Sequence, residues 1–302
     1  MLKAVNLAER LGFAPDDRVL ILHADDVASS HASNAAAIEC LEQGSLTSAS
    51  ILVPAPWFPE VAAYARDHPE ADFGVHLTLT CEYDPYRWRA LTDRSAAPGL
   101  YDEQGYLWHT VGQAVEHISV KEAELELRAQ IETALAAGID VTHFDTHMGT
   151  VVQPKFMELF VSLGLEYGIP VFIFRADQER LRDSGMGYYW SALEPQLRRM
   201  DEARFPVLDH ILVNTLECPP EEKEAHFKSL FADLWPGLTH FLIHPAKPSD
   251  EVSAMTESAP LRAQDYELFR DRSMAEELAR LGIHTTGYRQ IRDAYRSGAL
   301  KS

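Results

Sequence analysis

Short apolar segments alternate with segments of helical periodicity, and this alternation limits the fold of the chain more than any other feature. The apolar segments are rich in β-branched residues, as buried strands are. We predict strands at Val19–His23, Ala49–Val53, Phe73–Leu79, Val141–His147, Val171–Arg175, Ile211–Leu216, His240–His244 and Ile283–Tyr288, and helices at Asn34–Gln43, Val120–Ala137, Lys155–Tyr167, Glu221–Leu234 and Asp265–Leu281. Repeated strand–helix alternation predicts a parallel sheet, and the pattern alone leaves open whether the sheet closes into a barrel or is doubly wound.

The length of 302 residues fits one α/β domain that spans residues 1–302 and carries extended loops. Single α/β barrels reach this size, and a chain that is 46% hydrophobic can bury a large core. Two long connections, from Thr80 to Ser119 and from Pro245 to Pro260, interrupt the alternation. Loops of this length in a compact domain either shape a site or move.

The formal net charge of −19 excludes several classes of partner. Nucleic-acid binding needs clustered Lys and Arg, and an anionic membrane repels an acidic surface. We therefore expect a neutral or cationic small-molecule substrate, no nucleic acid and no membrane. The three cysteines are widely spaced and the first residues lack an unbroken apolar segment, which favours a reduced, cytoplasmic protein. A monomer and a homodimer both remain open.

Several predicted strands contain or end in polar residues that would be costly to bury without a purpose. The first strand runs into Asp25 and Asp26, and the third contains His76. Later strands end in Arg175 and His244. Parallel α/β folds gather their sites at the C-terminal ends of the strands, so we expect these groups to meet at one rim.

The fourth predicted strand carries a row of polar residues that suggests metal binding. Side chains alternate along a strand, so His143, Asp145 and His147 share one face. Alone, this row fits a hydrogen-bond ladder as well as a metal site. Together with the acidic pair and the histidine on other strands, it favours one divalent ion held by Asp26, His76 and His147, with the other two residues supporting the ligands. Two imidazoles suit Zn²⁺, Mn²⁺, Co²⁺ or Fe²⁺, whereas Mg²⁺ prefers more oxygen.

The remaining polar residues predict catalytic and substrate-binding roles. Asp25 and Asp26 point in different directions, so one can bind the metal while the other takes a proton from water. His244 is the expected general acid, because histidine titrates near neutrality. Arg175 is expected to hold a substrate oxygen or a catalytic carboxylate, with a structural ion pair as the alternative.

Aromatic side chains in the long loop after the third strand suggest a sugar site. Tyr83 and Trp88 are predicted to stack on sugar rings, and packing of the loop itself is the alternative. Asn34 is predicted to cap the first long helix.

The ordered motifs of the chain resemble the YdjC-type carbohydrate deacetylases, also called the chitooligosaccharide deacetylase family. These motifs are ILHADD at 21–26, Gly44–Ser50, Gly74–Thr80, Thr142–His147 and Ile243–Pro245, and together they span nearly the whole chain. The resemblance implies a distorted (β/α) barrel and metal-dependent removal of acetyl groups from N-acetylated sugars, usually with Mg²⁺.

The same resemblance implies a role for each matching residue. Asp25 aligns with the catalytic base and His244 with the general acid. Asp26, His76 and His147 align with the metal ligands.

The chain departs from the family pattern beside these residues. The family often continues the fourth-strand motif with two further histidines, where this chain has Gly149 and Val151, and it usually has an aromatic residue and a glycine where this chain has Val27 and Ala28. These changes leave the metal ligands intact and alter the pocket next to them. We predict a metal-dependent hydrolase of N-acetylated sugars, with an oligosaccharide or a smaller sugar as substrate. An amidohydrolase, a phosphoesterase and a non-catalytic carbohydrate-binding protein are the alternatives.

Overall fold

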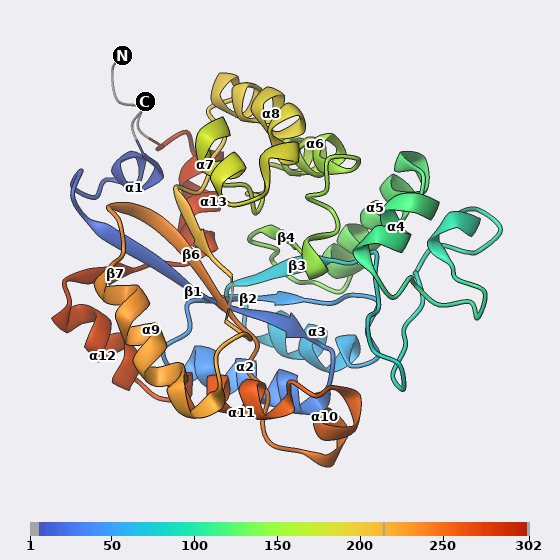
Figure 1. Cartoon of the computed structure of the whole chain (residues 1–302), viewed down its shortest axis with the longest axis horizontal. Helices are drawn as coiled ribbons and strands as arrows, with labels where there is room; N and C mark the ends of the chain where they lie inside the picture. The colour runs from blue at the N-terminus through green and yellow to red at the C-terminus, as the bar shows by residue number, and fades with distance from the viewer. Residues whose placement is uncertain (1–5, 214, 301–302) are drawn as a thin grey trace.

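A parallel sheet forms the centre of the computed structural model, which describes residues 6–213 and 215–300 (Figure 1). Its strands are β1 (Arg18–Val27), β2 (Ser48–Ile51), β3 (Phe73–Leu77), β4 (Phe144–Thr146), β5 (His210–Leu212), β6 (Gly237–Ile243) and β7 (Ile283–Thr285). Their order is β4-β3-β2-β1-β6-β5, and β7 pairs with the first residues of β1. All the pairings among these strands are parallel, as the strand–helix alternation predicts.

The predicted fifth strand, Val171–Arg175, connects β4 to β5 without forming a continuous strand. One bridge joins Val171 to Phe144 in β4, and a second reaches Leu208, just before β5. Between the two bridges, the amide of Ile173 donates to the carbonyl of Val171, which turns the backbone and interrupts the ladder. The strands therefore form a distorted barrel, and the pairing is interrupted between β4 and β5, where only isolated bridges are formed.

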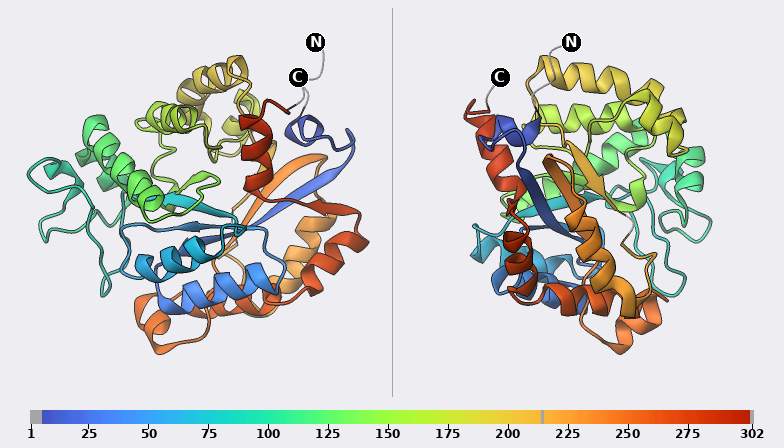
Figure 2. Two further views of the ribbon diagram at one scale, coloured as in Figure 1. Left: turned by 180° about the vertical axis from the view of Figure 1, so that it is seen from behind. Right: turned by 60° about the vertical axis from the view of Figure 1, so that its left-hand side comes forward.

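Helices surround this sheet. They are α1 (Leu7–Arg10), α2 (His31–Glu42), α3 (Phe58–Asp67), α4 (Val111–His117), α5 (Val120–Ala136), α6 (Met157–Tyr167), α7 (Gln178–Asp183), α8 (Trp190–Glu202), α9 (Lys223–Ala232), α10 (Asp250–Met255), α11 (Ala259–Phe269), α12 (Ser273–Arg280) and α13 (Tyr288–Arg296), with 3₁₀ turns η1 (Pro98–Leu100), η2 (His147–Gly149), η3 (Gly187–Tyr189) and η4 (Pro220–Glu222). Helices α2, α3 and α11 lie along one side of the sheet, and α6 and α8 lie along the opposite side (Figures 1 and 2). Within the described residues, no helix is long and apolar enough to cross a bilayer.

Two predicted features of the helices are wrong in detail. The single helix predicted over Asp265–Leu281 is divided into α11 and α12, because Ser45 binds the carbonyl of Phe269 at the end of α11 and the carboxylate of Asp271 caps the amide of Ser273. Asn34 does not cap α2. The cap is Ser30, and Asn34 lies in the first turn of the helix, where it accepts a hydrogen bond from Ala28 N at 2.7 Å.

Several predicted strands are shorter in the structure. β3 ends at Leu77 and β7 at Thr285, before the predicted ends at Leu79 and Tyr288. The strand predicted over Val141–His147 is reduced to β4, and His147 follows it in the turn η2. The strand predicted over Ile211–Leu216 is represented by β5, and its residue 214 lies outside the described residues.

Candidate metal centre

The C-terminal ends of β1, β3 and β4 bring polar side chains together at one end of the barrel. Asp25 and Asp26 come from β1, His76 from β3 and His147 from the turn after β4. Asp26 has a φ of 62°, in the left-handed region that residues with a Cβ rarely adopt. Met148, directly after His147, has a φ of 55°. Strained backbone of this kind is often found at functional sites, where the surrounding structure holds it.

Asp26, His76 and His147 form the candidate metal centre. Their potential ligand atoms all lie within 4.8 Å of one another. Oδ1 of Asp26 is 3.1 Å from Nδ1 of His147 and 3.5 Å from Nε2 of His76, and all three side chains are buried. One carboxylate and two imidazoles leave coordination positions open for water or substrate, as catalytic metal sites do.

Each of the two histidines also contacts a second carboxylate. Nδ1 of His76 lies 2.6 Å from Oδ1 of Asp145, and Nε2 of His147 lies 2.8 Å from Oε2 of Glu82. Carboxylates in this position fix the orientation of metal-binding imidazoles and increase their basicity. The sequence predicts the support from Asp145. It gives no signal for Glu82, which lies in the long loop after β3.

The charges around the two histidines fit a cation. Burial alone lowers the pKa of His147, but the carboxylates of Glu82 and Asp26 more than offset this and raise it to about 9. Burial likewise opposes the charged form of His76, and Asp145 is foremost among the carboxylates that raise its pKa well above the ordinary value. The carboxylates that favour protonation of these histidines would also attract a metal ion that takes the place of the protons.

Arg262 in α11 binds the carboxylate oxygen of Asp26 that does not face the histidines. Its Nη1 donates to Oδ2 of Asp26 at 2.9 Å, and its Nη2 donates to the hydroxyl of Tyr83 at 3.2 Å. Burial raises the pKa of Asp26, but the charge of Arg262 and the hydrogen bond from His147 hold it well below the usual range. Sequence reasoning missed Arg262, because an arginine in an amphipathic helix is ordinary until the helix is placed against the sheet.

Asp25 lies between the metal centre and His244. Its Oδ2 is 3.9 Å from Nε2 of His76 and 4.0 Å from Nε2 of His244, and its Oδ1 is 3.2 Å from Nε2 of His23. The two longer distances exceed a hydrogen bond, so Asp25 is not bonded directly to either of these histidines. Asp25 and His244 face the same space, as the sequence predicts.

A buried ion pair holds the backbone of His244. The amide of His244 donates to Oδ2 of Asp265 at 3.0 Å, and Oδ1 of Asp265 is bound by Lys223 from α9. Burial lowers the pKa of His244 to about 4, and the positive charge of Arg262 acts in the same direction. The imidazole is therefore neutral at pH 7 in the metal-free protein.

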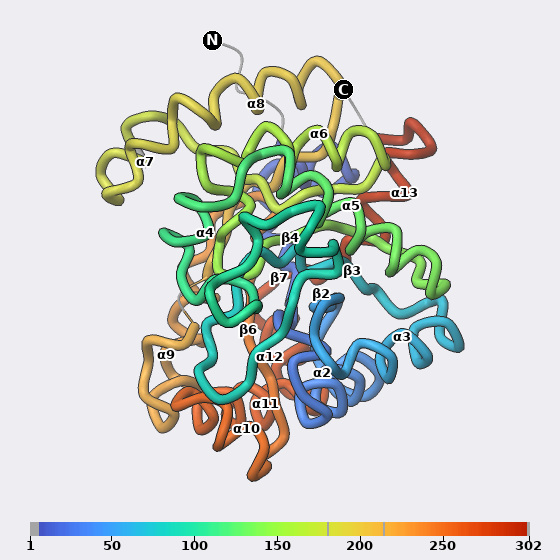
Figure 3. Tube along the Cα trace, turned by 90° about the vertical axis from the view of Figure 1, so that its right-hand side faces the viewer, coloured from blue at the N-terminus to red at the C-terminus, as the bar shows by residue number. Residues whose placement is uncertain are grey.

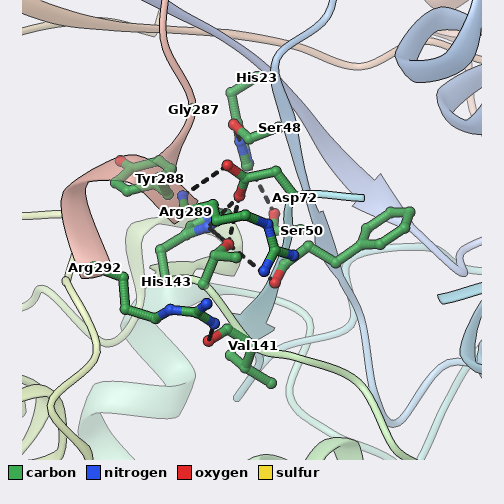
Figure 4. Close-up of polar contacts among 12 residues, drawn as sticks. His23, Ser48, Ser50, Asp72, Val141, His143, Gly287, Tyr288, Arg289 and Arg292 are labelled. Atoms are coloured by element: carbon green, nitrogen blue, oxygen red, sulfur yellow. Dashed lines mark hydrogen bonds and ion pairs between the residues drawn. The ribbon is translucent and has the colours of Figure 1, made fainter. Parts of the chain in front are cut away.

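A network of buried polar side chains includes His23, Asp72 and His143 (Figure 4). His23 accompanies Asp145 there, with its Nε2 at 3.0 Å from Oδ2 of that carboxylate. His143 binds Oγ1 of Thr142 at 2.9 Å through Nδ1, and its ring stacks on Tyr288. Nε2 of His143 is 4.0 Å from Oδ2 of Asp145, so its predicted support of the ligands is not a direct hydrogen bond.

The close fit of this network explains a glycine in the third strand. A Cβ on Gly74 would lie only 2.5 Å from the ring of His143. No side chain fits in that space, so a glycine must precede the Val75-His76 pair here.

The structure brings one of the three predicted substrate-binding residues to the site. Tyr83 lines the cavity next to the metal centre. Trp88 is buried behind it and donates from Nε1 to the carbonyl of Thr80 at 3.1 Å. Arg175 points away and pairs with Asp201 of α8. For Trp88 the structure therefore fits loop packing, and for Arg175 it fits a structural ion pair, which were the alternatives open from the sequence.

A cavity of about 580 Å³ adjoins the metal centre. Asp25, Asp26, His76, His147, His244 and Arg262 line one end of it. This size is typical of sites for small organic ligands. The arrangement combines a potential cation, a carboxylate and a neutral imidazole around one cavity, which suits hydrolysis of a small substrate.

Comparisons with known proteins relate the whole chain to one family. The family described as "YdjC-like protein" matches residues 19–280. A carbohydrate deacetylase of Thermus thermophilus is 32% identical over 290 residues, which are 96% of this chain and 99% of that protein. A carbohydrate deacetylase of Thermoanaerobacter pseudethanolicus is 23% identical over 271 residues, which are 90% of this chain and 98% of that protein.

A solved structure has the same fold. The crystal structure of a putative cellobiose-phosphate cleavage protein from Enterococcus faecalis V583 superposes with a TM-score of 0.72 and 23% identity. The match covers 90% of this chain and 98% of that one. At this identity the likeness concerns the fold, and the distorted barrel predicted from the sequence is confirmed.

Proposed function

The chain belongs to the YdjC-like protein family, and from that membership we propose that it is a metal-dependent carbohydrate deacetylase. The observation that carries the proposal is the meeting of Asp26, His76 and His147 around one point, with Asp25 and His244 facing the same cavity. The relatives are named carbohydrate deacetylases, and the reaction proposed for this chain is hydrolysis of an N-acetyl amide to acetate and an amine.

Asp26, His76 and His147 would hold one divalent ion, which when bound acidifies water and polarises the amide carbonyl. The family resemblance favours Mg²⁺, whereas two imidazole ligands favour Zn²⁺ or another transition ion. Glu82 would keep the ring of His147 in the orientation that presents Nδ1 to the ion.

Asp25 is the proposed base. Its Oδ2 is 3.9 Å from Nε2 of His76, one of the residues that would hold the ion, and Asp25 lines the cavity. From there the carboxylate can take the proton of the attacking water. Arg262 binds Asp26 and not Asp25, and His23 lies at 3.2 Å from Oδ1 of Asp25, so Oδ2 is the oxygen proposed to accept that proton.

His244 is the proposed donor to the departing amine. Because its imidazole is neutral at pH 7, it must gain a proton within the reaction before it can give one. Oδ2 of Asp25 lies 4.0 Å from Nε2 of His244, and a water in contact with both can carry the proton from base to acid. In balance, one water is consumed, the C–N bond breaks, and the amine leaves with the proton that Asp25 took up.

The test combines metal analysis with acetate release. The purified protein is assayed on N-acetylated mono- and disaccharides, on phosphate esters and on cyclic amides, with Mg²⁺, Mn²⁺ or Zn²⁺ added. His147→Ala should lose both bound metal and turnover, whereas Asp25→Asn should keep the metal and lose turnover. His31→Ala, at an exposed histidine, is the matched control. Full activity in His147→Ala would contradict the assignment of the metal ligands. Turnover of phosphate esters or cyclic amides alone would show that the substrate is not an N-acetylated sugar.

A further inference from the structure

The cavity next to the metal centre has a polar end and an apolar end. The titratable groups gather where the metal ligands lie, whereas the walls beyond them are built largely from aliphatic, aromatic and thioether side chains, among them Met148, Phe172, Leu181, Met186, Leu193 and Val213. These side chains come from η2, the segment after α6, helix α7 and the residues that follow it, helix α8, and the segment after β5. The chain therefore supplies this apolar wall from several separate elements.

Three of these apolar side chains are partly exposed, and contact of their surface with water is unfavourable. Met148 is 52% exposed, and Met186 and Val213 are each 39% exposed. All three line the same cavity. Grouped exposed apolar side chains beside a polar site mark a surface that binds something apolar. Figure 3 shows α7 and α8 at the edge of the molecule, extending beyond α6.

An unmodified oligosaccharide does not match this wall. Each hydroxyl that leaves water needs a hydrogen-bond partner, and a buried hydroxyl without one is costly. The charged and imidazole side chains that line the cavity belong to the candidate metal centre and its neighbours, where Asp25 and His244 would meet the amide. Beside Met186, the cavity lining includes Tyr189, whose hydroxyl already binds Gln153. Gly149, on the same wall, adds no polar group.

We propose that the substrate carries an apolar substituent, an alkyl or aryl group, that occupies the apolar end of the cavity while its amide lies at the metal centre. The inference rests on the proposed amide hydrolysis and adds to it the class of substrate. The apolar group can belong to the acyl side of the amide or to the aglycone of the amino sugar, and both sources share the chemistry that the wall recognises. The cavity of about 580 Å³ has room for such a group beside an acetylated amine.

Two series of substrates separate the two sources. The first lengthens the acyl group of N-acyl glucosamine from acetyl to octanoyl. The second keeps the acetyl group and lengthens an O-alkyl aglycone from methyl to octyl. In one of the series kcat/KM should rise by roughly fourfold for each added methylene, which is the factor that corresponds to burial of one methylene. Acetyl hydrolysis with no increase in either series overturns the inference and leaves the proposed function standing.

A binding measurement keeps the inference testable without turnover. Titration calorimetry compares octyl with methyl glucosaminide, and octanoate with acetate, on the metal-loaded protein. Tighter binding of the octyl or octanoyl compound without hydrolysis of any amide supports the apolar site and overturns the proposed deacetylation. Equal binding within both pairs overturns the apolar site whatever the activity.

Polar substitutions in the wall test its location. Met186→Gln combined with Val213→Gln places amides at partly exposed positions, where the fold tolerates them. The double variant should lower kcat/KM for the octyl or octanoyl substrate by about tenfold, because two apolar contacts are lost. Leu125→Gln, at an exposed leucine of α5 outside the cavity, should change nothing. A chain-length dependence that persists in the double variant contradicts this placement.

Discussion

Glu82 accepts a hydrogen bond from Nε2 of His147 at 2.8 Å, and it does so from a loop and not from the sheet. Burial raises the pKa of Glu82, but the charge of His147 more than offsets this and lowers it, so the carboxylate stays ionised. Asp145 makes the same contact with His76 from β4. The two carboxylates hold the rings of His76 and His147 so that one nitrogen of each ring faces Asp26. The position of Glu82, unlike that of Asp145, depends on how the loop after β3 packs.

Replacement of Glu82 should weaken metal binding without removing a ligand. Glu82→Gln keeps the size of the side chain and removes its charge, and the loss of such a partner typically costs about 10- to 100-fold in metal affinity. The affinity is measured by competition with a chromophoric chelator. Asp84→Asn, at an almost fully exposed carboxylate of the same loop, should leave the affinity unchanged. Equal affinity of the two variants would show that Glu82 does not support the metal centre.

The stability of the metal-free protein should fall as the pH rises from neutral to alkaline. The pKa of His147 is about 9 in the folded chain, against 6.5 ordinarily, so the folded state binds this proton more tightly than the unfolded state does. The resulting stabilisation is complete below about pH 6.5 and is lost as the pH passes through 9. His76, whose pKa is also raised, contributes in the same direction.

A bound divalent ion should remove this dependence, because it takes the place of the protons. The increase in Tm on addition of Zn²⁺ or Mn²⁺ should therefore become larger between pH 6 and pH 9. Thermal unfolding with and without metal at several pH values measures it. An increase in Tm that is the same at every pH would mean that the ion does not bind through these histidines.

The meeting of the metal-centre residues could be predicted because each one follows or interrupts an apolar strand. Parallel strands end at one edge, so Asp26, His76 and His147 had to lie near one another. Glu82 and Arg262 could not be predicted in the same way. Acidic loops and basic helices are common, and only tertiary packing decides which carboxylate or guanidinium reaches a buried histidine or aspartate.

The parts of the fold that departed from prediction share a cause. At Val171–Arg175 the composition is that of a strand, yet a local hydrogen bond between Ile173 and Val171 interrupts the pairing. The division between α11 and α12 arises from Ser45, which is distant in sequence and binds backbone carbonyls at the junction. Periodicity reports local preference and carries no information about such contacts.

Removal of the buried lysine behind His244 should destabilise the protein strongly. Lys223 and Asp265 are both fully buried, and Lys223→Met leaves the carboxylate without its counter-ion. Loss of one partner of a buried pair costs about 3–5 kcal/mol of unfolding free energy. Lys228→Met in the same helix breaks an exposed pair with Glu224 and should have little effect. Urea unfolding measures both variants. A small effect at both positions would show that Asp265 is neutralised by other means.

Ala28, where the family resemblance implies glycine, has a φ of 79° and is buried directly after β1. The left-handed conformation costs a residue with a Cβ about 1–2 kcal/mol, and glycine avoids this cost. Ala28→Gly should therefore keep the unfolding free energy or raise it by about 1 kcal/mol, even though a buried methyl group is lost. Ala63→Gly, within helix α3, should lower it by about 0.5–1 kcal/mol. Equal losses in the two variants, measured by thermal unfolding, would show that the backbone at Ala28 is not strained.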